Sequence, residues 1–379
     1  MGVADLTRNA VHVLPAGALE AKLALGRPLR VKLGIDVTAP DVTLGNGIPL
    51  QRMAAFQREG HVGVLIVGDY TTRIGDPSGR SMARPILSDD EIERNAARFV
   101  EQASAIIDPE RTEVRFNGEW LAKLDFAEIL RLTRTTTVAQ ILERDDFAKR
   151  HRAREPISIS ELLYPLMQAY DSVAIEADVE LGGTDQLYNL LAGREVMQAY
   201  GLEPQVALTV EYLVSWDGEG MSASRGNYIG LKEAPEDQFG KAMRISDELM
   251  PQWYALVLES DPPAGDPLEA KLALARSIVA RSHGEEAARA AEEHFTRVVR
   301  EGRAPDDVPE HTLPDGDTLH LPAVLSEAFG VSTSQARRLI AQGGVRIDGR
   351  QVDELDLPRS ELAGTLVQAG KRRYVRFVG

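Results

Sequence analysis

A polar stripe runs along one segment whose other residues are those of a buried helix. Tyr164, Gln168 and Asp171 are spaced i, i+4 and i+7, so a helix would carry a phenol, an amide and a carboxylate on one face. Burying such groups without hydrogen-bond partners is costly. The spacing therefore favours a polar pocket beside this helix, with simple core packing as the alternative. The segment Gly182-Gly-Thr-Asp-Gln186 offers further polar groups to the same pocket.

Two loops that follow strand-like segments have the composition of ligand-binding turns. Residues 34–47 lead from a strand end into a helix start, where glycines and backbone N–H groups can hold an anion or a nucleotide. Residues 68–80 follow another strand, and Asp76 in this loop could face an ammonium group. Three arginines in or after the loop could face phosphates: Arg73, Arg80 and Arg84. Taken alone, each loop reads equally well as a structural turn with solvated side chains.

A third loop, residues 220–227 (Gly-Met-Ser-Ala-Ser-Arg-Gly-Asn), is rich in Gly and Ser and reads by itself as a mobile connection. No Ser-His-Asp or Cys-His arrangement has a persuasive spacing, and the seven histidines are scattered, so we expect no metal site. The chain has no cysteine, which excludes disulfides and fits a reducing cytoplasm.

Alternating strands and helices are expected to position these residues. Short β-branched segments predict strands at 31–35, 63–67, 112–116, 178–181 and 206–210. Amphipathic segments predict helices at 47–58, 88–107, 124–134, 158–168 and 184–200. The alternation is typical of an α/β fold with a doubly wound parallel sheet. Ligands of such sheets bind beyond the carboxyl ends of the strands, where the loops after Ile35, Val67 and Leu181 would meet.

After residue 231 the pattern becomes wholly helical, with helices predicted at 235–244, 247–258, 267–281 and 284–300. Residues 304–318 are rich in Pro and Asp and predict a linker. We therefore expect four parts: an α/β domain over 1–230 with helices inserted at about 85–165, a helical domain over 231–303, the linker over 304–318, and a small α+β module over 319–379.

The 379-residue chain is acidic, with a formal net charge of −15 and a pI near 5.1. This argues against a protein coated in nucleic acid. Basic residues nevertheless gather near the C-terminus, as a solvated face or an RNA-binding face: Arg337, Arg338, Arg346, Lys371 and Arg372. No apolar run is long enough to span a bilayer and the N-terminus does not read as a signal peptide, so we expect a cytoplasmic protein without membrane contact.

Together these segments resemble the tyrosyl-tRNA synthetases, class I enzymes with a Rossmann-like fold, in the bacterial branch with a short C-terminal RNA-binding module. The resemblance rests on Ile74-Gly-Asp-Pro-Ser-Gly-Arg80, Asp171-Ser-Val-Ala174 and Asp178-Val-Glu-Leu-Gly-Gly-Thr-Asp-Gln186, and it extends from about Arg27 to the chain end. The terminal module resembles the RNA-binding fold named after ribosomal protein S-four, through Ser334–Gly349.

The resemblance implies a role for each matching position. Tyrosine would be bound by Thr71, Asp76, Tyr164, Gln168, Asp171 and Gln186, with Asp171 facing the phenol. ATP, as its Mg²⁺ complex, and the adenylate would be bound by Asp36, Thr38, Gly45, Gly183, Asp185, Met221, Ser222 and Ser224. The resemblance also implies that tRNA(Tyr) contacts the terminal module through the basic residues above. It further implies a homodimer formed by inserted helices around residues 120–165, and no bound metal or organic cofactor.

Two signatures of this family are altered in the chain. His-x-Gly-His reads Thr43-Leu-Gly-Asn46; the Asn46 amide can still donate a hydrogen bond, whereas the short Thr43 hydroxyl cannot reach as far as an imidazole. Lys-Met-Ser-Lys-Ser reads Gly220-Met-Ser-Ala-Ser224, so Gly220 and Ala223 replace both lysines. Three nearby cations could compensate in part: Arg80, Arg84 and Arg225.

The missing groups act mainly on the departing pyrophosphate, so their loss predicts activation slower by about 10³ to 10⁶. Three hypotheses follow: a tyrosine–tRNA ligase with an altered ATP mechanism, a non-catalytic paralogue that binds tyrosine or tRNA in regulation, and a ligase repurposed in a biosynthetic pathway. Lys32 stands where another branch of the family carries a phenol-contacting tyrosine, so phenol recognition here would rest more heavily on Asp171.

Overall fold

The structure, a computed structural model, describes residues 2–76, 87–300, 308–370 and 373–379. The chain divides into two units, which are described separately. The first unit comprises Met1–Glu233 and Lys241–Leu274, and the second comprises Ala234–Gly240 and Ala275–Gly379. No helix among these described residues is long and apolar enough to cross a membrane.

The first unit is built on a six-stranded sheet with the strand order β1-β6-β5-β2-β3-β4. Its strands are β1 (Ala10–Leu14), β2 (Arg30–Ile35), β3 (Val62–Val67), β4 (Thr112–Phe116), β5 (Val179–Gly183) and β6 (Val206–Val210). Strands β2 to β6 are parallel, as expected, and β1 pairs antiparallel with β6 at the edge. This antiparallel edge strand makes the sheet mixed. The sequence analysis did not identify β1, a short strand that ends just before Pro15.

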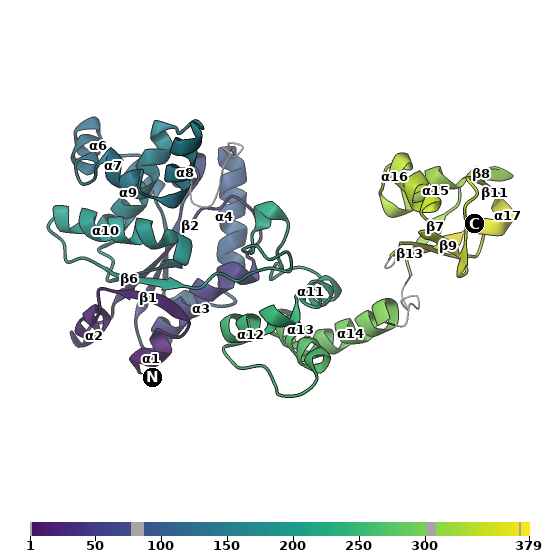
Figure 1. The fold of residues 1–379 in the computed structure, drawn as a ribbon, viewed down its shortest axis with the longest axis horizontal. Coiled ribbons are helices and arrows are strands. Elements are labelled where there is room, and N and C mark those ends of the chain that lie inside the picture. Colours follow the sequence, from purple (N-terminus) through teal and green to yellow (C-terminus); the bar gives the residue numbers. More distant parts are fainter. Residues whose placement is uncertain (1, 77–86, 301–307, 371–372) are drawn as a thin grey trace. The chain divides into compact units, whose positions relative to one another are not determined.

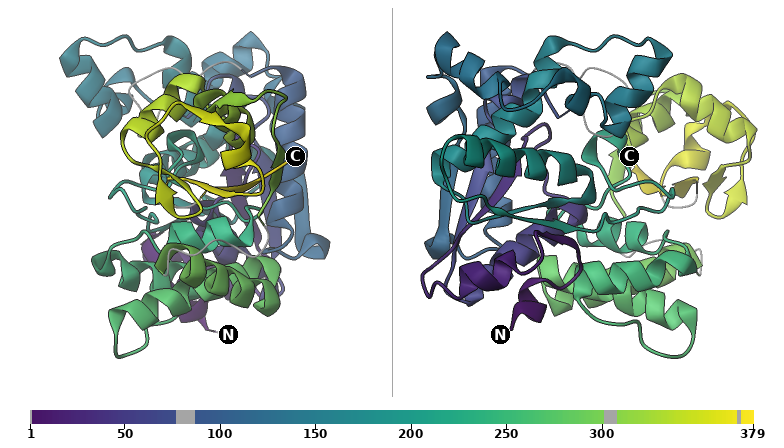
Figure 2. Two further views of the ribbon diagram at one scale, coloured as in Figure 1. Left: turned by 90° about the vertical axis from the view of Figure 1, so that its right-hand side faces the viewer. Right: turned by 60° about the vertical axis from the view of Figure 1, so that its left-hand side comes forward.

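Helices cover both faces of the sheet, which confirms the doubly wound architecture. Helices α3 (Leu44–Arg58) and α4 (Asp89–Ala103) lie on one face, and α9 (Ile159–Ile175) and α10 (Leu187–Ala199) lie on the other (Figures 1 and 2). Strand β6 is buried at every position, as expected for a parallel strand covered on both sides. The chain changes direction across the sheet between β2 and β5, and ligand clefts of doubly wound sheets form at such points.

Short helices complete the first unit: α1 (Val3–Leu6), α2 (Ala18–Leu23), α5 (Gly118–Leu121), α6 (Phe126–Thr133), α7 (Val138–Ile141) and α8 (Asp145–Ala153). Helices α6, α7 and α8 fall within the insertion predicted between about 85 and 165. Helix α9 continues to Ile175, beyond the predicted end at residue 168, so Tyr164, Gln168 and Asp171 share one helix.

The all-helical stretch contains α11 (Pro235–Ala242), α12 (Met250–Trp253), α13 (Pro267–His283) and α14 (Glu285–Phe295). The stretch predicted as a helix over 247–258 is helical at every residue, but the type of helix changes along it. A 3-10 helix (Asp247–Leu249), α12 and a π-helix (Tyr254–Leu258) follow one another. Pro251, which has no N–H to donate, lies in the first turn of α12, where proline is tolerated.

The C-terminal part of the second unit is the expected α+β module. Its five-stranded sheet has the order β10-β9-β12-β13-β7 and a strand pair β11-β8 lies beside it. The elements are β7 (Glu310–Thr312), β8 (Thr318–His320), α15 (Leu321–Phe329), α16 (Thr333–Ala341), β9 (Val345–Ile347), β10 (Arg350–Gln351), β11 (Asp356–Pro358), α17 (Arg359–Leu362), β12 (Leu366–Ala369) and β13 (Arg373–Val378).

Part of the segment predicted as a linker belongs to this module. Residues Glu310–Thr312 pair in parallel with β13, and Leu313 is buried in the module's core. The linker prediction over 304–318 is therefore wrong for these residues, because the Pro and Asp around them obscured a three-residue strand. Residues 304–307 of the predicted linker lie outside the described residues.

Candidate functional site

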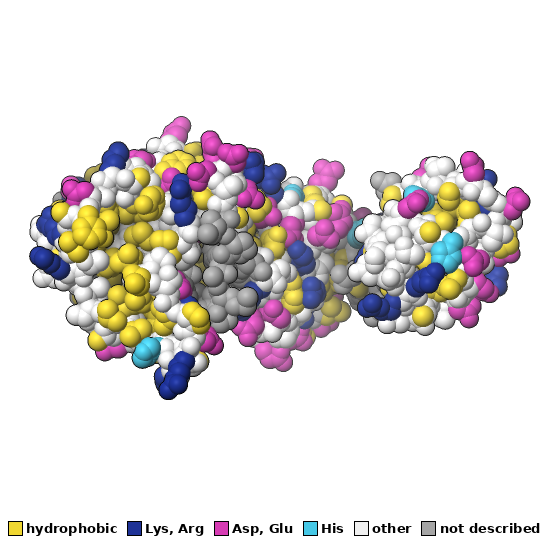
Figure 3. Space-filling model, turned by 90° about the horizontal axis from the view of Figure 1, so that it is seen from above, with side chains coloured by type: hydrophobic (Ala, Val, Ile, Leu, Met, Phe, Trp, Pro, Cys, Tyr) yellow, Lys and Arg dark blue, Asp and Glu magenta, His cyan; other side chains and the backbone are white. Residues whose placement is uncertain are grey.

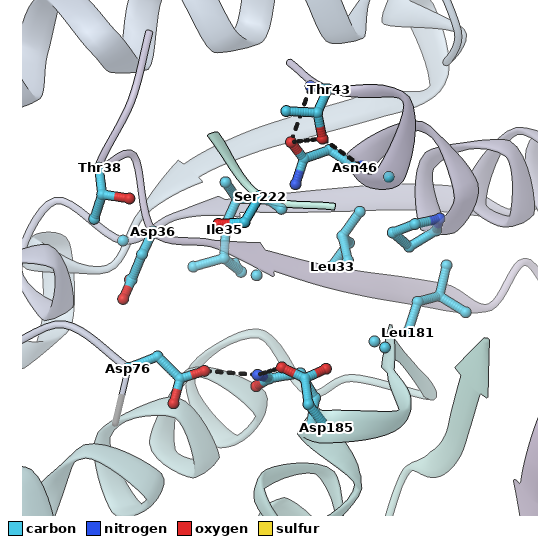
Figure 4. Close-up of a pocket in the computed structure, with 18 of the residues that line it drawn as sticks. Leu33, Ile35, Asp36, Thr38, Thr43, Asn46, Asp76, Leu181, Asp185 and Ser222 are labelled. Atoms are coloured by element: carbon cyan, nitrogen blue, oxygen red, sulfur yellow. Dashed lines mark hydrogen bonds between the residues drawn. The ribbon is translucent and has the colours of Figure 1, made fainter. Parts of the chain in front are cut away.

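A cavity of about 300 Å³ lies at the carboxyl ends of the central strands of the first unit. The loops that follow β2, β3 and β5 meet there, together with α9, the first turn of α3 and the loop after residue 220 (Figure 4). Sixteen of the candidate site residues line it: Asp36, Thr38, Thr43, Gly45, Asn46, Thr71, Asp76, Tyr164, Gln168, Asp171, Gly183, Asp185, Gln186, Met221, Ser222 and Ala223. Segments far apart in the sequence therefore contribute to a single cavity.

Some candidate residues lie elsewhere. Gly220 is not among the lining residues, although its neighbour Met221 is. Arg80, Arg84, Lys371, Arg372 and the side chain of Ser224 fall outside the described residues. In the second unit Arg337 and Arg338 of α16 and Arg346 of β9 are exposed.

Asp36 organises one wall of the cavity from the end of β2. Its carboxylate accepts hydrogen bonds from the Tyr164 hydroxyl at 3.0 Å and from Thr71 Oγ1 at 2.7 Å. Gly68 is required beside it, because a Cβ there would collide with both Asp36 Oδ1 and Thr71 Oγ1. Burial and the nearby carboxylates raise the pKa of Tyr164 well above its ordinary value, so this phenol keeps its proton.

Asp171 forms the floor at the α9 side and is only 3% exposed. Trp120 Nε1 donates to it at 2.8 Å and Asn117 Nδ2 donates at 3.4 Å. Burial raises the pKa of Asp171 to about 7, while the Lys32 ammonium and the Trp120 hydrogen bond act in the opposite direction. The sequence analysis missed Asn117 and Trp120, which follow β4 and belong to none of the motifs that it identified.

A side-chain amide links two carboxylates on the opposite wall. Gln186 Nε2 donates to Asp76 Oδ2 at 2.6 Å and to Asp185 Oδ2 at 2.7 Å (Figure 4). Asn189 Nδ2 in turn donates to Gln186 Oε1 at 2.9 Å, so the amide orientation is determined on both sides. The Tyr212 hydroxyl, another residue that the sequence analysis missed, also hydrogen-bonds to Asp185, whose pKa is raised by burial.

Thr43 and Asn46, the first and last residues of the segment Thr43-Leu-Gly-Asn46, form a closed capping box at the start of α3. Thr43 Oγ1 accepts from Asn46 N at 3.1 Å and donates to Asn46 Oδ1 at 2.9 Å, while Thr43 N donates to the same oxygen at 3.0 Å (Figure 4). The helix consequently begins at Leu44, three residues earlier than predicted. Because the Thr43 N–H requires an acceptor, Asn46 turns its oxygen toward Thr43 and its amide nitrogen toward the cavity.

The loop that carries Gly220 and Ala223 is held by one buried side chain. Asn227 Oδ1 accepts from Ser222 N at 2.9 Å, and its Nδ2 donates to both oxygens of Asp217 at 3.0 and 2.9 Å. The Arg225 guanidinium pairs with Glu219 at 2.9 Å, and both side chains are exposed. Arg225 therefore points its charge at another loop residue and does not line the cavity.

The cavity is strongly acidic. Six carboxylates line it: Asp36, Asp41, Asp76, Asp171, Asp185 and Glu211. No Lys, Arg or His is found among the lining residues in the described part of the chain. These described residues also contain no cluster of three or more His, Asp or Glu side chains suited to hold a metal ion. Such a lining favours ligands that bring a positive charge.

Comparisons with known proteins identify relatives along the whole chain. The family model "tRNA synthetases class I (W and Y)" matches residues 24–300, and the "S4 domain" model matches residues 321–357. A tyrosine–tRNA ligase of Moorella thermoacetica is 48% identical, over 98% of this chain and 94% of the relative. A tyrosine–tRNA ligase of Haemophilus influenzae is 46% identical, over 99% and 96%.

Solved structures share the fold over about three quarters of the chain. A tyrosyl-tRNA synthetase of Archaeoglobus fulgidus complexed with L-tyrosine superposes with a TM-score of 0.61 at 20% identity, over 76% of this chain and 98% of the other. A mitochondrial tyrosyl-tRNA synthetase of Coccidioides posadasii superposes with a TM-score of 0.60 at 21% identity.

Proposed function

The chain belongs to the class I tyrosyl-tRNA synthetases with a C-terminal S4 domain, and from this premise we propose that it binds tyrosine and tRNA(Tyr). We further propose that it activates tyrosine with ATP much more slowly than a family member that carries both signatures unaltered. The proposal is carried by the charge of the cavity. Six carboxylates and none of the described cations line it, so it suits the ammonium of an amino acid and opposes a triphosphate.

The tyrosine end of the cavity supports substrate binding. Asp171 is positioned to accept the phenol hydrogen, since Trp120 and Asn117 already hold its carboxylate. The Tyr164 hydroxyl donates its hydrogen to Asp36, which leaves its oxygen lone pairs for an ammonium. Further partners for the ammonium and the body of the substrate are Thr71, Asp76, Gln168 and Gln186, all of which line the cavity.

The nucleotide end retains groups for a nucleoside. Asp185 and Gly183 would meet the ribose hydroxyls, with a carboxylate as the acceptor. The rest of the nucleotide would be surrounded by Asp36 and by the backbone around Thr38, Gly45, Met221 and Ser222. Ser224 is assigned to the same ATP-binding group from its place in the Gly220–Ser224 motif. ATP as its Mg²⁺ complex is the second substrate of the family.

The deficiency lies at the leaving group. In activation a carboxylate oxygen of tyrosine attacks the α-phosphorus of ATP, and the bond to pyrophosphate breaks, so negative charge grows on the departing phosphates. The first signature position offers Thr43, whose hydroxyl is engaged with Asn46, and the two lysine positions offer Gly220 and Ala223. Each missing charge-assisted hydrogen bond is worth about 1.5–3 kcal/mol. Losing three slows the step by about 10³ to 10⁶, with non-additive effects.

Two measurements test this proposal. Titration calorimetry should detect tyrosine binding, which Asp171→Asn weakens sharply, whereas Asp41→Asn, a neutralisation in the same cavity away from the proposed tyrosine contacts, leaves it nearly unchanged. Tyrosine-dependent exchange of pyrophosphate into ATP should be barely detectable. Undetectable tyrosine binding would refute the pocket assignment, and robust exchange would refute the impairment.

A second candidate is a non-catalytic paralogue, or a repurposed ligase, that uses the tyrosine pocket without activating tyrosine. The closed capping box favours it, because the Thr43 hydroxyl and the backbone N–H groups of Thr43 and Asn46 are engaged within the box. Of the donors of these two residues, the Asn46 amide nitrogen is left for a nucleotide phosphate at the helix start. The exchange assay separates the candidates: a slow but tyrosine-dependent rate supports the ligase, and tyrosine binding without any exchange supports the paralogue.

The S4 domain would supply the tRNA affinity. Arg337 and Arg338 on α16 and Arg346 on β9 are exposed and can offer guanidinium groups to a phosphate backbone. Lys371 and Arg372, which lie outside the described residues, are assigned to tRNA binding from the sequence. Counterion release makes such binding fall steeply as salt rises.

The inserted helices would form a homodimer. Phe126, Val138 and Ile159 are 72%, 60% and 76% exposed, and hydrophobic side chains gather over the part of the first unit that carries α6 to α9 (Figure 3). Apolar groups grouped in this way on a monomer surface commonly mark a protein interface, which supports a dimer formed through this region.

A further inference from the structure

We propose that the buried Lys32–Glu180 ion pair is a positioning device that holds the Gln168 amide with its oxygen toward the cavity, so that the site selects ligands carrying an ammonium group. The pair lies beside the cavity and lines no part of it. The inference rests on the proposed binding of tyrosine, and it identifies the residues that define one end of the recognised ligand.

Lys32 has no hydrogen left for a ligand. Its side chain, on β2, is completely buried. The three hydrogens of Nζ meet three acceptors: Glu180 Oε1 at 2.9 Å, the Gln168 backbone oxygen at 2.8 Å and Ser172 Oγ at 2.8 Å. Lys32 therefore cannot contact a bound phenol. Its role differs from that of the phenol-contacting tyrosine that another branch of the family carries at this position.

Glu180, on β5, is equally buried and fully engaged. Its Oε1 accepts from Lys32 and from Gln168 Nε2, the latter at 3.2 Å. Its Oε2 accepts from Gln205 Nε2 and from Ser172 Oγ. The Glu180 carboxylate, paired with the Lys32 ammonium, presents acceptor oxygens, so it faces the nitrogen of the Gln168 amide rather than its oxygen.

The orientation of Gln168 determines what the cavity presents. With Nε2 directed at Glu180, the amide oxygen is the atom left for a ligand at the cavity wall that Gln168 lines. Under the proposed function the ammonium takes a position beside this oxygen, and the Tyr164 oxygen and the Asp76 carboxylate, whose residues also line the cavity, are further acceptors for it. A reversed amide would present N–H groups to that position, and an ammonium there would lose an acceptor and meet a donor.

A purely structural role accounts less well for the pair. Replacing a buried ion pair by apolar residues of similar volume is often neutral or stabilising, so burial of two charges is weak support for a stabilising function. Every donor and acceptor of this pair is nevertheless matched, and one match reaches a residue of the cavity wall. An apolar pair of the same size could not fix the orientation of the Gln168 amide, because it would offer no acceptor to Gln168 Nε2.

The decisive variant is Lys32→Met with Glu180→Gln, which preserves volume and removes both charges. Lys32 lowers and Glu180 raises the pKa of Asp171, and the effect of Lys32 is the larger, so removing them together raises this pKa further. Calorimetry would compare tyrosine with 3-(4-hydroxyphenyl)propanoate, which lacks the ammonium, and with phenylalanine, which lacks the hydroxyl. The comparison with phenylalanine is therefore made above the pH range in which Asp171 titrates. We expect the preference for tyrosine over the desamino compound to fall about tenfold, and the preference over phenylalanine to stay within about twofold.

Glu180→Asp provides a second variant that keeps the charge. The carboxylate withdraws by one methylene, so the flexible Lys32 stem can follow it while the contact to Gln168 breaks; the same selective fall is expected. Arg30→Met is the matched control, because Arg30 is also a β2 cation paired with a carboxylate, Glu113 at 2.7 Å, but its side chain bonds to Glu113 and the Ile175 backbone oxygen, neither of which lines the cavity. It should leave both preferences unchanged.

The outcomes separate this inference from the proposed function. If the unmodified protein does not bind tyrosine, the proposed function fails and the inference fails with it. If it binds tyrosine but both preferences fall together in Lys32→Met/Glu180→Gln and in Glu180→Asp, the pair is structural and the inference is overturned. If neither preference changes in the variants, Gln168 does not depend on the pair, and the inference is overturned as well.

Discussion

Restoring the missing cations should recover the activation step. The change is Thr43→His with Gly220→Lys and Ala223→Lys, which restores both lysines of one family signature and the first histidine of the other. A side chain fits at position 220, because the nearest atom to a Cβ there is Tyr212 Cδ1 at 3.8 Å. Ala223 already lines the cavity, so a lysine at that position begins at the cavity wall.

The expected gain follows from the number of restored contacts. Three charge-assisted hydrogen bonds at the lower value of about 1.5 kcal/mol each sum to about 4.5 kcal/mol, or about 10³ in rate. The cavity carboxylates will attract the new lysines and offset part of this gain, so an increase of at least about 10² is expected. Losing the Thr43 cap costs about 1 kcal/mol of stability without acting on the transition state.

The assay is tyrosine-dependent pyrophosphate exchange, with tyrosine affinity measured in parallel by calorimetry. Tyrosine affinity should barely change, and the two lysines should help more together than singly because the loop closes as a unit. Ala105→Lys with Ala122→Lys adds the same lysine charge at exposed positions outside the cavity and should give no gain. Exchange that does not rise in the triple variant would refute the reasoning and indicate a cleft remodelled for a different use.

Three further results are expected. Because burial raises the pKa of Asp171 from 3.8 to about 7, tyrosine affinity should rise as the carboxyl ionises between about pH 6 and pH 8. Folding stability should decline as pH rises from 3.8 to about 7, because the Asp171 carboxyl ionises in the unfolded chain before it ionises in the folded one. Asp171→Asn should abolish the rise in tyrosine affinity and the fall in stability. If either trend persists in this variant, another group is titrating. Removing residues 308–379, a boundary that includes β7, should abolish most salt-sensitive tRNA binding in gel shifts and spare tyrosine binding. Phe126→Asp with Ile159→Asp should yield a monomer in sedimentation at micromolar concentration, and an unmodified protein that sediments only as a monomer would contradict the dimer.

Hydrophobic patterning was sufficient to predict most of the sheet. The parallel strands β2, β3, β5 and β6 are short and largely buried, and β4 at the sheet edge is half-buried. Such short apolar segments stand out from the amphipathic helices between them. Strand β1 and strand β7 escaped the same reasoning. Each is short and exposed over part of its length, and each depends on a partner strand that is distant in sequence, β6 for β1 and β13 for β7.

The candidate site divides in a similar way. The sequence motifs identified most residues that line the cavity, because few side-chain types can bind a given ligand group at a given position. The motifs did not reveal Asn117, Trp120 or Tyr212, whose hydrogen bonds to Asp171 and Asp185 arise only when separate loops meet at the strand ends. Nor did they indicate that Thr43 and Asn46 would satisfy each other as a helix cap.

Local sequence therefore determined the family, the order of most strands and helices, and the presence of Thr43, Gly220 and Ala223, on which the proposed slow activation depends. Each of these depends on residue type and on spacing along the chain. The folded chain alone established that Lys32 is paired with Glu180 rather than aimed at a ligand, and that six carboxylates share one cavity. These properties arise when β2, β5 and α9 pack together, because burial and the direction of a hydrogen bond depend on neighbours that are remote in sequence.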